Sequence, residues 1–329
     1  MKIAFASFRH SHVFVLYEMA RKNALFEIVG ACEENAEARK DAEQKGVVFT
    51  CETYDELLEN KDIEAIVIGS CYGDRGTMAI KALKSGKHVI CDKPLCTKIK
   101  ELDKIEKLAK AKNLMVSCMF TMRFEPKMKA VKTLLDSGEL GKINNVYFGG
   151  QHPLQYRRRP AWYFEKDKHG GVINDIAIHG IDALHFLFGF ELDKINASRS
   201  WNAFATEEKD FKDSAQIMLT GKSGVGVIAD VSYAVPDGVE FNLPYYWQFY
   251  FWGEKGTLSF SYNGEVYYYK KGDSNKIVLQ PEQTIDYLTD FYNAVKGKEE
   301  VILSAKDVFS STRETLKVQK KSWAKRGKA

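Results

Sequence analysis

The sequence lacks several features that would assign it to a specialised class of protein. Its six cysteines all precede residue 119 and none forms a C-x-x-C pair, which argues against a secreted disulfide framework or a cysteine metal site. No apolar run approaches the length of a membrane span, so we expect no membrane partner. The net charge is only +4, and the histidines show no metal-ligand spacing. We therefore expect no nucleic-acid partner and no metal.

The composition is that of an ordinary globular protein. The 329 residues are 45% hydrophobic and 28% charged, which predicts about two domains with large buried cores. The apolar stretch from Ile3 to Phe8 is too short for the core of a signal peptide. Together with the unpaired cysteines, this predicts a cytoplasmic location.

The first part of the chain alternates short apolar runs with amphipathic segments, a pattern typical of βαβ units in a parallel sheet. We predict strands at Lys2–Ala6, Glu27–Cys32, Ala65–Ile68, His88–Cys91 and Met115–Cys118. We predict helices at Val13–Lys22, Ala36–Lys45, Tyr54–Glu59, Gly76–Lys84 and Ile99–Lys112. Right-handed crossovers then build an α/β domain with a doubly wound parallel sheet, which binds its ligand at the carboxyl ends of the strands.

The pattern changes near residue 123, where strands begin to follow one another without intervening helices. After a helix at Pro126–Leu135 we predict strands at Ile143–Phe148, Ile195–Trp201, Ala215–Leu219, Gly226–Ser232, Tyr246–Phe251, Thr257–Ser261 and Val266–Tyr269. Helices at Thr284–Val295 and Ser304–Lys321 close the chain, the second with a Ser304-x-x-Asp307 capping box. We therefore divide the chain into residues 1–122, a dinucleotide-binding domain, and 123–329, an α+β domain with an open, largely antiparallel sheet.

The first strand-turn-helix lacks the glycines of the dinucleotide fingerprint G-x-G-x-x-G, since Ala6, Phe8 and Ser11 occupy their positions. Phe8 is the most serious departure, because the second glycine lets the backbone approach the pyrophosphate. Arg9 and His10 lie in the loop where that pyrophosphate would bind. A role for His10 in starting and packing the helix is an equal alternative.

Glu33 ends the second predicted strand, at the distance from the loop where an acid accepts hydrogen bonds from the adenosine ribose. A carboxylate there repels a 2′-phosphate, which favours NAD but does not exclude NADP, since Arg9 could pair with that phosphate. From position alone, Glu33 and Glu34 serve equally well as caps of the following helix.

Two later motifs place side chains that can take part in catalysis at the ends of regular elements. Asp92-Lys93-Pro94 follows a predicted buried strand, and the proline restricts the backbone of the lysine before it. Asp175 and His179 are four residues apart at the start of an apolar helix, so they share one face.

In this order and separation the motifs resemble those of the Gfo/Idh/MocA oxidoreductases, the relatives of glucose-fructose oxidoreductase and inositol dehydrogenase. The resemblance extends over nearly the whole chain and includes Arg123-Phe124-x-Pro126. It implies an N-terminal Rossmann domain and a substrate between the open sheet and the nicotinamide. It also implies that His179 is the general base, that Asp175 orients it or binds a hydroxyl, and that Lys93 binds the reacting oxygen.

Two departures from this family lie near the expected nicotinamide. The usual Glu-Lys-Pro is Asp92-Lys93-Pro94, and the usual Thr-Pro-Asn-x-x-His is Ser70-Cys71-Tyr72-Gly73-Asp74-Arg75. Tyr72 and Arg75 thus replace the Asn and His that shape the cleft, and we predict that both contact the cofactor together with Ser70, Asp92 and Lys93. Either the cofactor binds in an altered pose or it has been lost.

The resemblance also points to a substrate loop. Arg157 and the two arginines after it could bind a carboxylate or phosphate, although a solvated loop or subunit contact is the simpler interpretation. Trp162 suits the face of a sugar ring, and we predict that it and Arg123 contact the substrate.

We therefore predict a cytoplasmic NAD(P)-dependent dehydrogenase that acts on the hydroxyl or keto group of a sugar or polyol. The alternatives are a redox-silent sugar-binding or regulatory homologue and an NAD-dependent glycosidase. Family relatives suggest a homodimer or homotetramer, with the aromatic segment from Tyr245 to Trp252 as its contact. For that segment, a sheet face packed on helices or another subunit is favoured over a sugar-stacking surface.

Overall fold

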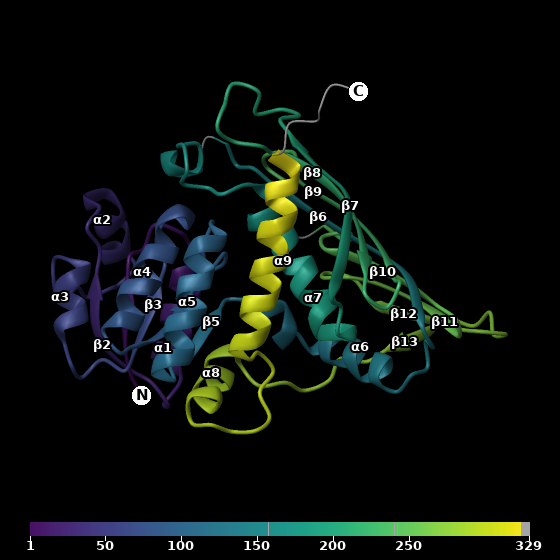
Figure 1. Ribbon diagram of the computed structural model, residues 1–329, viewed down its shortest axis with the longest axis horizontal. Coiled ribbons are helices and arrows are strands. Elements are labelled where there is room, and N and C mark those ends of the chain that lie inside the picture. The colour runs from purple at the N-terminus through teal and green to yellow at the C-terminus, as the bar shows by residue number, and fades with distance from the viewer. Residues whose placement is uncertain (157, 240, 242, 324–329) are drawn as a thin grey trace. The chain divides into compact units, whose positions relative to one another are not determined.

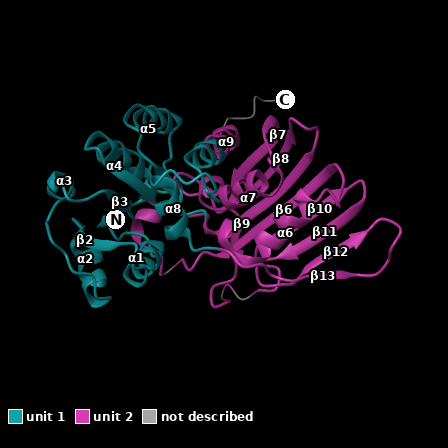
Figure 2. Cartoon of the chain, turned by 90° about the horizontal axis from the view of Figure 1, so that it is seen from below, with its two compact units in different colours: residues 1–120, 167–169, 285–312 teal, residues 121–166, 170–284, 313–329 magenta. Residues whose placement is uncertain are grey.

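The computed structural model describes residues 1–156, 158–239, 241 and 243–323 (Figure 1). They form two compact units, each contributed by separate stretches of chain (Figure 2). Unit 1 comprises residues 1–120, 167–169 and 285–312, and unit 2 comprises 121–166, 170–284 and 313–329.

Unit 1 contains a five-stranded parallel sheet with strand order β2-β1-β3-β4-β5. Its strands are β1 Lys2–Ala6, β2 Glu27–Cys32, β3 Ala65–Ile68, β4 His88–Cys91 and β5 Val116–Cys118. The helices that alternate with them are α1 His12–Lys22, α2 Ala36–Gln44, α3 Tyr54–Glu59, α4 Tyr72–Lys84 and α5 Ile99–Lys112. All four residues of β3 are buried, because a parallel sheet is covered on both faces. The predicted doubly wound α/β fold is confirmed.

Helix α4 begins four residues earlier than the predicted Gly76, although Gly73 has low helix propensity. Contacts within unit 1 explain this early start. The N–H of Gly73 donates to the carbonyl of Lys168 at 2.8 Å, and the ammonium of Lys168 pairs with Asp74 at 2.8 Å. The segment 167–169 thus stabilises a turn that local sequence preference does not favour.

Unit 1 also contains helix α8, Tyr287–Val295, and the first part of helix α9, Ala305–Trp323. The hydroxyl groups of Tyr287 and Ser117 lie 2.8 Å apart, which joins α8 to β5. The predicted capping box at the start of α9 is confirmed, since Ser304 and Asp307 exchange hydrogen bonds between side chain and backbone. In the portion of the chain that the structure describes, no helix has both the length and the apolar character required to cross a bilayer.

Unit 2 contains an eight-stranded sheet with strand order β13-β12-β11-β10-β6-β9-β8-β7. Its strands are β6 Ile143–Pro153, β7 Leu192–Trp201, β8 Ser214–Gly221, β9 Gly226–Val235, β10 Gln248–Gly253, β11 Gly256–Ser261, β12 Val266–Lys270 and β13 Ile277–Leu279. Only the central β6–β9 pair is parallel, so the predicted largely antiparallel sheet is confirmed. The short edge strand β13 was not predicted, because three residues give too little alternation to recognise.

The remaining helices of unit 2 are α6 Pro126–Asp136, a π-helical turn Ile173–Ala177 and α7 Ile178–Phe188, with single 3₁₀ turns at Thr121–Phe124 and Ala161–Tyr163. Helix α7 packs on one face of the sheet. A Cβ on Gly180 would collide with the ring of Phe148 on β6, so the helix approaches the sheet closely at this glycine. The rings of Phe188 and Phe251 are also in contact, with centroids 6.0 Å apart.

The aromatic residues of β10 alternate between the two faces of the sheet. Phe249 and Phe251 are fully buried on the α7 side, whereas Tyr250 and Trp252 are 37% and 46% exposed. The first face therefore belongs to the core, and the second is an exposed aromatic surface, as the two-residue period of a strand requires.

Candidate functional site

The loop between β1 and α1 turns the side chain of Phe8 into the core. Ser7 adopts a left-handed backbone conformation with φ of 69°, and Phe8 is only 3% exposed. Its ring lies among aromatic rings of the same unit, those of Phe5, Phe14, Tyr17 and Phe49. The residue that replaces the second glycine therefore leaves the surface of the loop free of its side chain.

Glu33 holds this loop to the end of β2. Its Oε2 accepts hydrogen bonds from the backbone N–H of Phe8 at 2.5 Å and from the hydroxyl of Ser7 at 3.1 Å. Its Oε1 accepts from the backbone N–H of Asn35, the N-cap of α2, at 2.8 Å. The carboxylate therefore holds the loop in place and supports the start of α2. Glu33 thus caps the following helix, one of its two predicted roles, and it also lies where the ribose contact was predicted.

A cavity of about 300 Å³ opens beside Glu33 at the carboxyl ends of β1 and β2. Its lining carries three acidic residues, Glu33, Glu34 and Asp74. Lys81, which also lines it, is paired with Asp55 at 2.8 Å. The cavity lies at the edge of the sheet where a doubly wound fold binds its ligand, and its acidic lining disfavours an additional phosphate.

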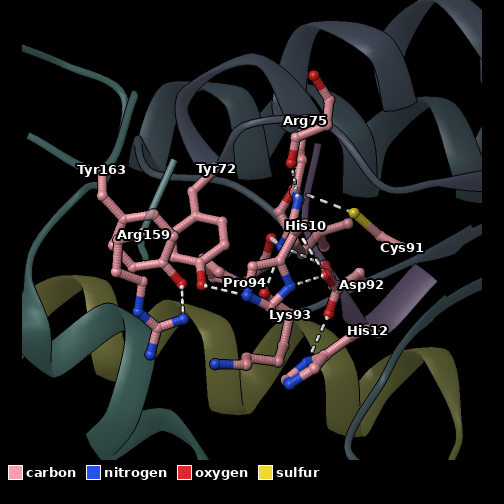
Figure 3. Close-up of polar contacts among 12 residues, drawn as sticks. His10, His12, Tyr72, Arg75, Cys91, Asp92, Lys93, Pro94, Arg159 and Tyr163 are labelled. Atoms are coloured by element: carbon pink, nitrogen blue, oxygen red, sulfur yellow. Dashed lines mark hydrogen bonds and ion pairs between the residues drawn. The ribbon is translucent and has the colours of Figure 1, made fainter. Parts of the chain in front are cut away.

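A buried polar cluster lies at the ends of β3 and β4 (Figure 3). Asp92 is at its centre, with Nδ1 of His10 2.6 Å from Oδ2 and Nη2 of Arg75 2.7 Å from the same oxygen. Nδ1 of His12 lies 3.3 Å from Oδ1, and the hydroxyl of Tyr72 lies 3.1 Å from Nε2 of His10. The cluster thus connects four of the predicted cofactor residues, His10, Tyr72, Arg75 and Asp92.

The charges in the cluster are set by burial and by its single strong cation. Burial opposes ionisation of Asp92, but Arg75 and His10 hold the pKa of its carboxyl well below the usual range. Burial lowers the pKa of His10 to about 3, against the attraction of Asp92. His10 is therefore neutral, and it donates from Nδ1 to Asp92 while Nε2 accepts from Tyr72.

His10, His12 and Asp92 offer ligand atoms within 4.8 Å of one another, a grouping that sequence spacing did not predict. Arg75, which carries a positive charge 2.7 Å from Asp92, would repel a cation placed there. Both ring nitrogens of His10 already have partners. We therefore assign these three residues to hydrogen bonding, not to a metal.

Lys93 follows Asp92 at the carboxyl end of β4 and is only 6% exposed. Its ammonium lies 5.8 Å from the centre of the Tyr72 ring, within the range of a cation–π contact. Ser70 contributes its carbonyl, which accepts a hydrogen bond from Nε of Arg75 at 2.8 Å. Ala6 pairs with Ile68 across β1 and β3 at this same edge.

Unit 2 holds the second motif. Asp175 lies in the π-helical turn, is 3% exposed, and accepts a hydrogen bond from the hydroxyl of Tyr233 on β9. His179 lies one turn later in α7, and its ring is 5.5 Å from that of Trp247. Tyr233 was not singled out from the sequence, because it belongs to no motif. Trp247 was considered only as part of the aromatic segment 245–252, since the sequence does not reveal its position near His179.

The predicted substrate residues in unit 2 occupy different environments. Arg123 forms a buried two-point ion pair with Asp182, with distances of 2.9 and 2.8 Å, and its guanidinium lies 5.3 Å from the ring of Phe186. Trp162 is 1% exposed, and its ring lies at a tilt against that of Tyr163, with centroids 4.4 Å apart. Arg157 lies outside the described residues. Substrate contact by these three residues stays a prediction.

Two family models match the chain. Residues 7–120 match an oxidoreductase family with an NAD-binding Rossmann fold, and residues 128–259 match the GFO/IDH/MocA C-terminal domain. These matches cover strands β2 to β5 of the parallel sheet and most of the larger sheet.

Curated proteins and solved structures are also similar to the chain. Myo-inositol 2-dehydrogenase of Thermotoga maritima is 27% identical over 202 residues, which are 60% of this chain and 58% of that protein. The scyllo-inositol 2-dehydrogenase (NAD⁺) of Bacillus subtilis is 29% identical over 61% of this chain and 58% of its own length. The matches thus span little more than half of these relatives. A levoglucosan dehydrogenase in complex with NADH and levoglucosan shares the fold, with a TM-score of 0.81 and 20% identity over 99% of this chain and 97% of that one.

Proposed function

Because this chain belongs to the Gfo/Idh/MocA family of oxidoreductases with an NAD-binding Rossmann domain, we propose that it oxidises a CH–OH group of a sugar or polyol, or reduces the corresponding carbonyl. Relatives named for inositol and levoglucosan support this class of substrate. The direction of hydride transfer depends on the relative concentrations of the alcohol and the carbonyl compound.

The observation that carries the proposal is the position of Lys93. It is an almost fully buried cation at the carboxyl edge of a doubly wound sheet, where such folds bind dinucleotides. A cation at this edge can stabilise a substrate oxygen that gains negative charge during hydride transfer.

The reaction divides between the chain and its cofactor. A nicotinamide bound at the carboxyl edge of the parallel sheet would supply the hydride acceptor, taking the electron pair of the broken C–H bond so that NAD⁺ would leave as NADH. His179 takes the hydroxyl proton, the alcohol becomes a carbonyl, and Lys93 hydrogen-bonds its oxygen. Asp175, whose carboxylate is held by Tyr233, orients the imidazole or binds a neighbouring hydroxyl.

The residues present fit NAD. The first turn of α1 contains no acidic residue, and the inward orientation of Phe8 leaves the loop surface open for a pyrophosphate. The acidic lining of the cavity beside Glu33 disfavours a 2′-phosphate, so we propose a preference for NAD over NADP. We therefore favour a functional cofactor site over a redox-silent homologue.

Turnover of a panel of substrates tests the proposal. Wild type with NAD⁺ and myo-inositol, scyllo-inositol or levoglucosan is expected to form NADH, measured by absorbance. Lys93→Ala and His179→Ala should abolish this activity, whereas the exposed control Lys100→Ala should retain it. Wild-type rates in both active-site variants would exclude the assignment. If NADH binds but no NADH accumulates, analysis of products from glycosides identifies the transient use of NAD by a glycosidase.

We also propose that the protein forms a homodimer or homotetramer through the exposed face of the unit 2 sheet. Four large apolar side chains on that face are 37–53% exposed, namely Met218, Ile228, Tyr250 and Trp252. They line a groove of about 920 Å³, and apolar side chains gathered on one exposed face often mark a protein contact. A cytoplasmic location agrees with the six free cysteine thiols.

A further inference from the structure

Two of the positions near Lys93 at which the chain departs from the family motifs are in direct contact. Arg75 stands where the family commonly has histidine, and Asp92 where it has glutamate. Aspartate is shorter than glutamate and arginine is longer than histidine, so the two side chains still reach each other. Nη2 of Arg75 lies 2.7 Å from Oδ2 of Asp92, and both side chains are fully buried. We propose that Arg75 is a positioning residue that holds the backbone carrying Lys93, an inference that rests on the proposed function of Lys93.

Arg75 binds the backbone on both sides of the site. Its Nη1 points at three successive carbonyls, with the carbonyl of Asp92 at 2.9 Å, that of Lys93 closer still, and that of Pro94 at 3.4 Å. Its Nε donates to the carbonyl of Ser70, at the end of the neighbouring strand, at 2.8 Å. One guanidinium therefore joins the ends of β3 and β4 at the residue that is proposed to act on the substrate oxygen.

Only arginine has the donor geometry for this role. A guanidinium presents five N–H groups in a rigid plane, whereas a lysine ammonium has three donors on a flexible stem and histidine has two at most. Lysine at position 75 would keep the charge beside Asp92 and lose most of the backbone bonds. Charge and positioning can thus be separated by substitution.

Tyr72 and His10 complete the arrangement. The Tyr72 ring lies 4.5 Å from the guanidinium carbon of Arg75 and 5.8 Å from the ammonium of Lys93, so one aromatic ring contacts both cations. The hydroxyl of Tyr72 is bound to His10, which in turn is bound to Asp92. Lys93 therefore lies beside a hydrogen-bonded network formed by Tyr72, His10, Asp92 and Arg75. The charged centre of this network is the Arg75–Asp92 ion pair.

Amide hydrogen exchange of the apoprotein tests the geometry without any substrate. We compare wild type with Arg75→Lys, Arg75→His, Asp92→Glu and the double variant Arg75→His/Asp92→Glu, with the exposed Arg21→Lys as control. The single variants are expected to accelerate exchange in peptides that cover residues 92–96, with little change in the helices of unit 2. The double variant restores the family pair and should return exchange toward the wild-type rate. Unchanged exchange at 92–96, or equal acceleration throughout the chain, overturns the inference.

Steady-state kinetics with NAD⁺ and the best polyol of the panel provide the second measurement. Displacing a reacting group by about 1 Å can cost about 100-fold in rate, so Arg75→Lys should lower kcat by between about tenfold and 100-fold. The KM for the polyol and the dissociation constant of NADH should change little. A role in folding alone would lower the melting temperature and leave kcat of the folded protein unchanged.

The two hypotheses fail in different ways. If Lys93→Ala loses turnover and Arg75→Lys keeps the wild-type kcat, the positioning role is wrong and the proposed function stands. If Lys93→Ala keeps turnover, the proposed function fails, and with it the catalytic meaning of the positioning role. Should Arg75→Lys fail to fold, the double variant decides, because recovery of kcat relative to Arg75→His supports the pair and its absence contradicts it.

Discussion

Nδ1 of His10 lies 2.6 Å from Oδ2 of Asp92, in a cluster where His10 is 5% exposed and Asp92 is fully buried. Since burial lowers the pKa of His10 to about 3, this contact is a hydrogen bond from a neutral imidazole to a carboxylate. It joins the loop before α1 to the segment that carries Lys93. The loop that lacks the glycine fingerprint is thereby tied to the proposed reaction centre by side chains.

The free energy of unfolding should decrease as the pH is lowered, because of His10. Its pKa drops from 6.5 in the unfolded chain to about 3 in the folded one, so between these values only the unfolded chain takes up the proton. The part of the free energy of unfolding that comes from the neutral His10 is fully present above pH 6.5. It is lost as the pH falls toward 3, by about 1.4 kcal/mol per pH unit within that range. Urea unfolding at pH 7.5 and pH 5 measures the slope.

His10→Gln is the matched variant for this measurement, because its amide can donate to Asp92 and accept from Tyr72 but does not titrate. Its unfolding free energy should depend less on pH than that of wild type. An identical pH dependence in the two proteins would contradict the assignment of a neutral His10.

Phe8→Gly should destabilise the protein, although it restores a glycine of the dinucleotide fingerprint. Phe8 fills an aromatic cluster, and removing such a ring typically costs about 3–5 kcal/mol. NADH should bind no more tightly, because the Phe8 side chain faces the core and not the loop surface. Thermal unfolding and a fluorescence titration with NADH measure both effects, with the exposed Val15→Ala on α1 as control. Tighter NADH binding by a stable variant would show that the phenylalanine obstructs the cofactor.

The fold followed from the sequence wherever burial imposes a simple period. The parallel strands β1 to β4 were predicted with their observed bounds, because strands covered on both faces are short apolar runs between turns. The start of α4 was not predicted correctly, since it depends on a contact with Lys168, nearly 100 positions later in the chain. Nor does any local pattern assign residues 285–312 to the same unit as the parallel sheet.

The candidate site was predictable as a set of positions but not as a network. Arg75 and Asp92 were each recognised as a departure from a family motif, yet their ion pair depends on the β3–β4 pairing and on the early start of α4. For Phe8 the side-chain direction follows from the positive φ of Ser7, which sequence patterns do not reveal for a residue other than glycine.

Gly73→Ala should destabilise unit 1. In an exposed helix this substitution stabilises by about 1 kcal/mol, because alanine has the higher helix propensity. Here a Cβ would collide with the carbonyl oxygen of Asp167, and overpacking of this kind costs about 1–3 kcal/mol. Displacement of the segment 167–169 should appear as faster amide exchange there. Thr77→Ala, one turn later on the exposed side of α4, is the control, and a gain in melting temperature for Gly73→Ala would contradict the close contact.

Ile228→Arg should dissociate the proposed oligomer without unfolding the chain. Ile228 is 53% exposed on β9 and lines the same groove as Trp252, so a charge there costs little in an isolated chain but would be buried without a partner in an interface. Sedimentation velocity of wild type should show a dimer or tetramer and that of the variant a monomer, with equal melting temperatures at low concentration. Val48→Arg, at a 73% exposed apolar position of unit 1, controls for a charge added outside the sheet. A wild-type monomer, or a variant that associates as strongly as wild type, would place the contact elsewhere or exclude it.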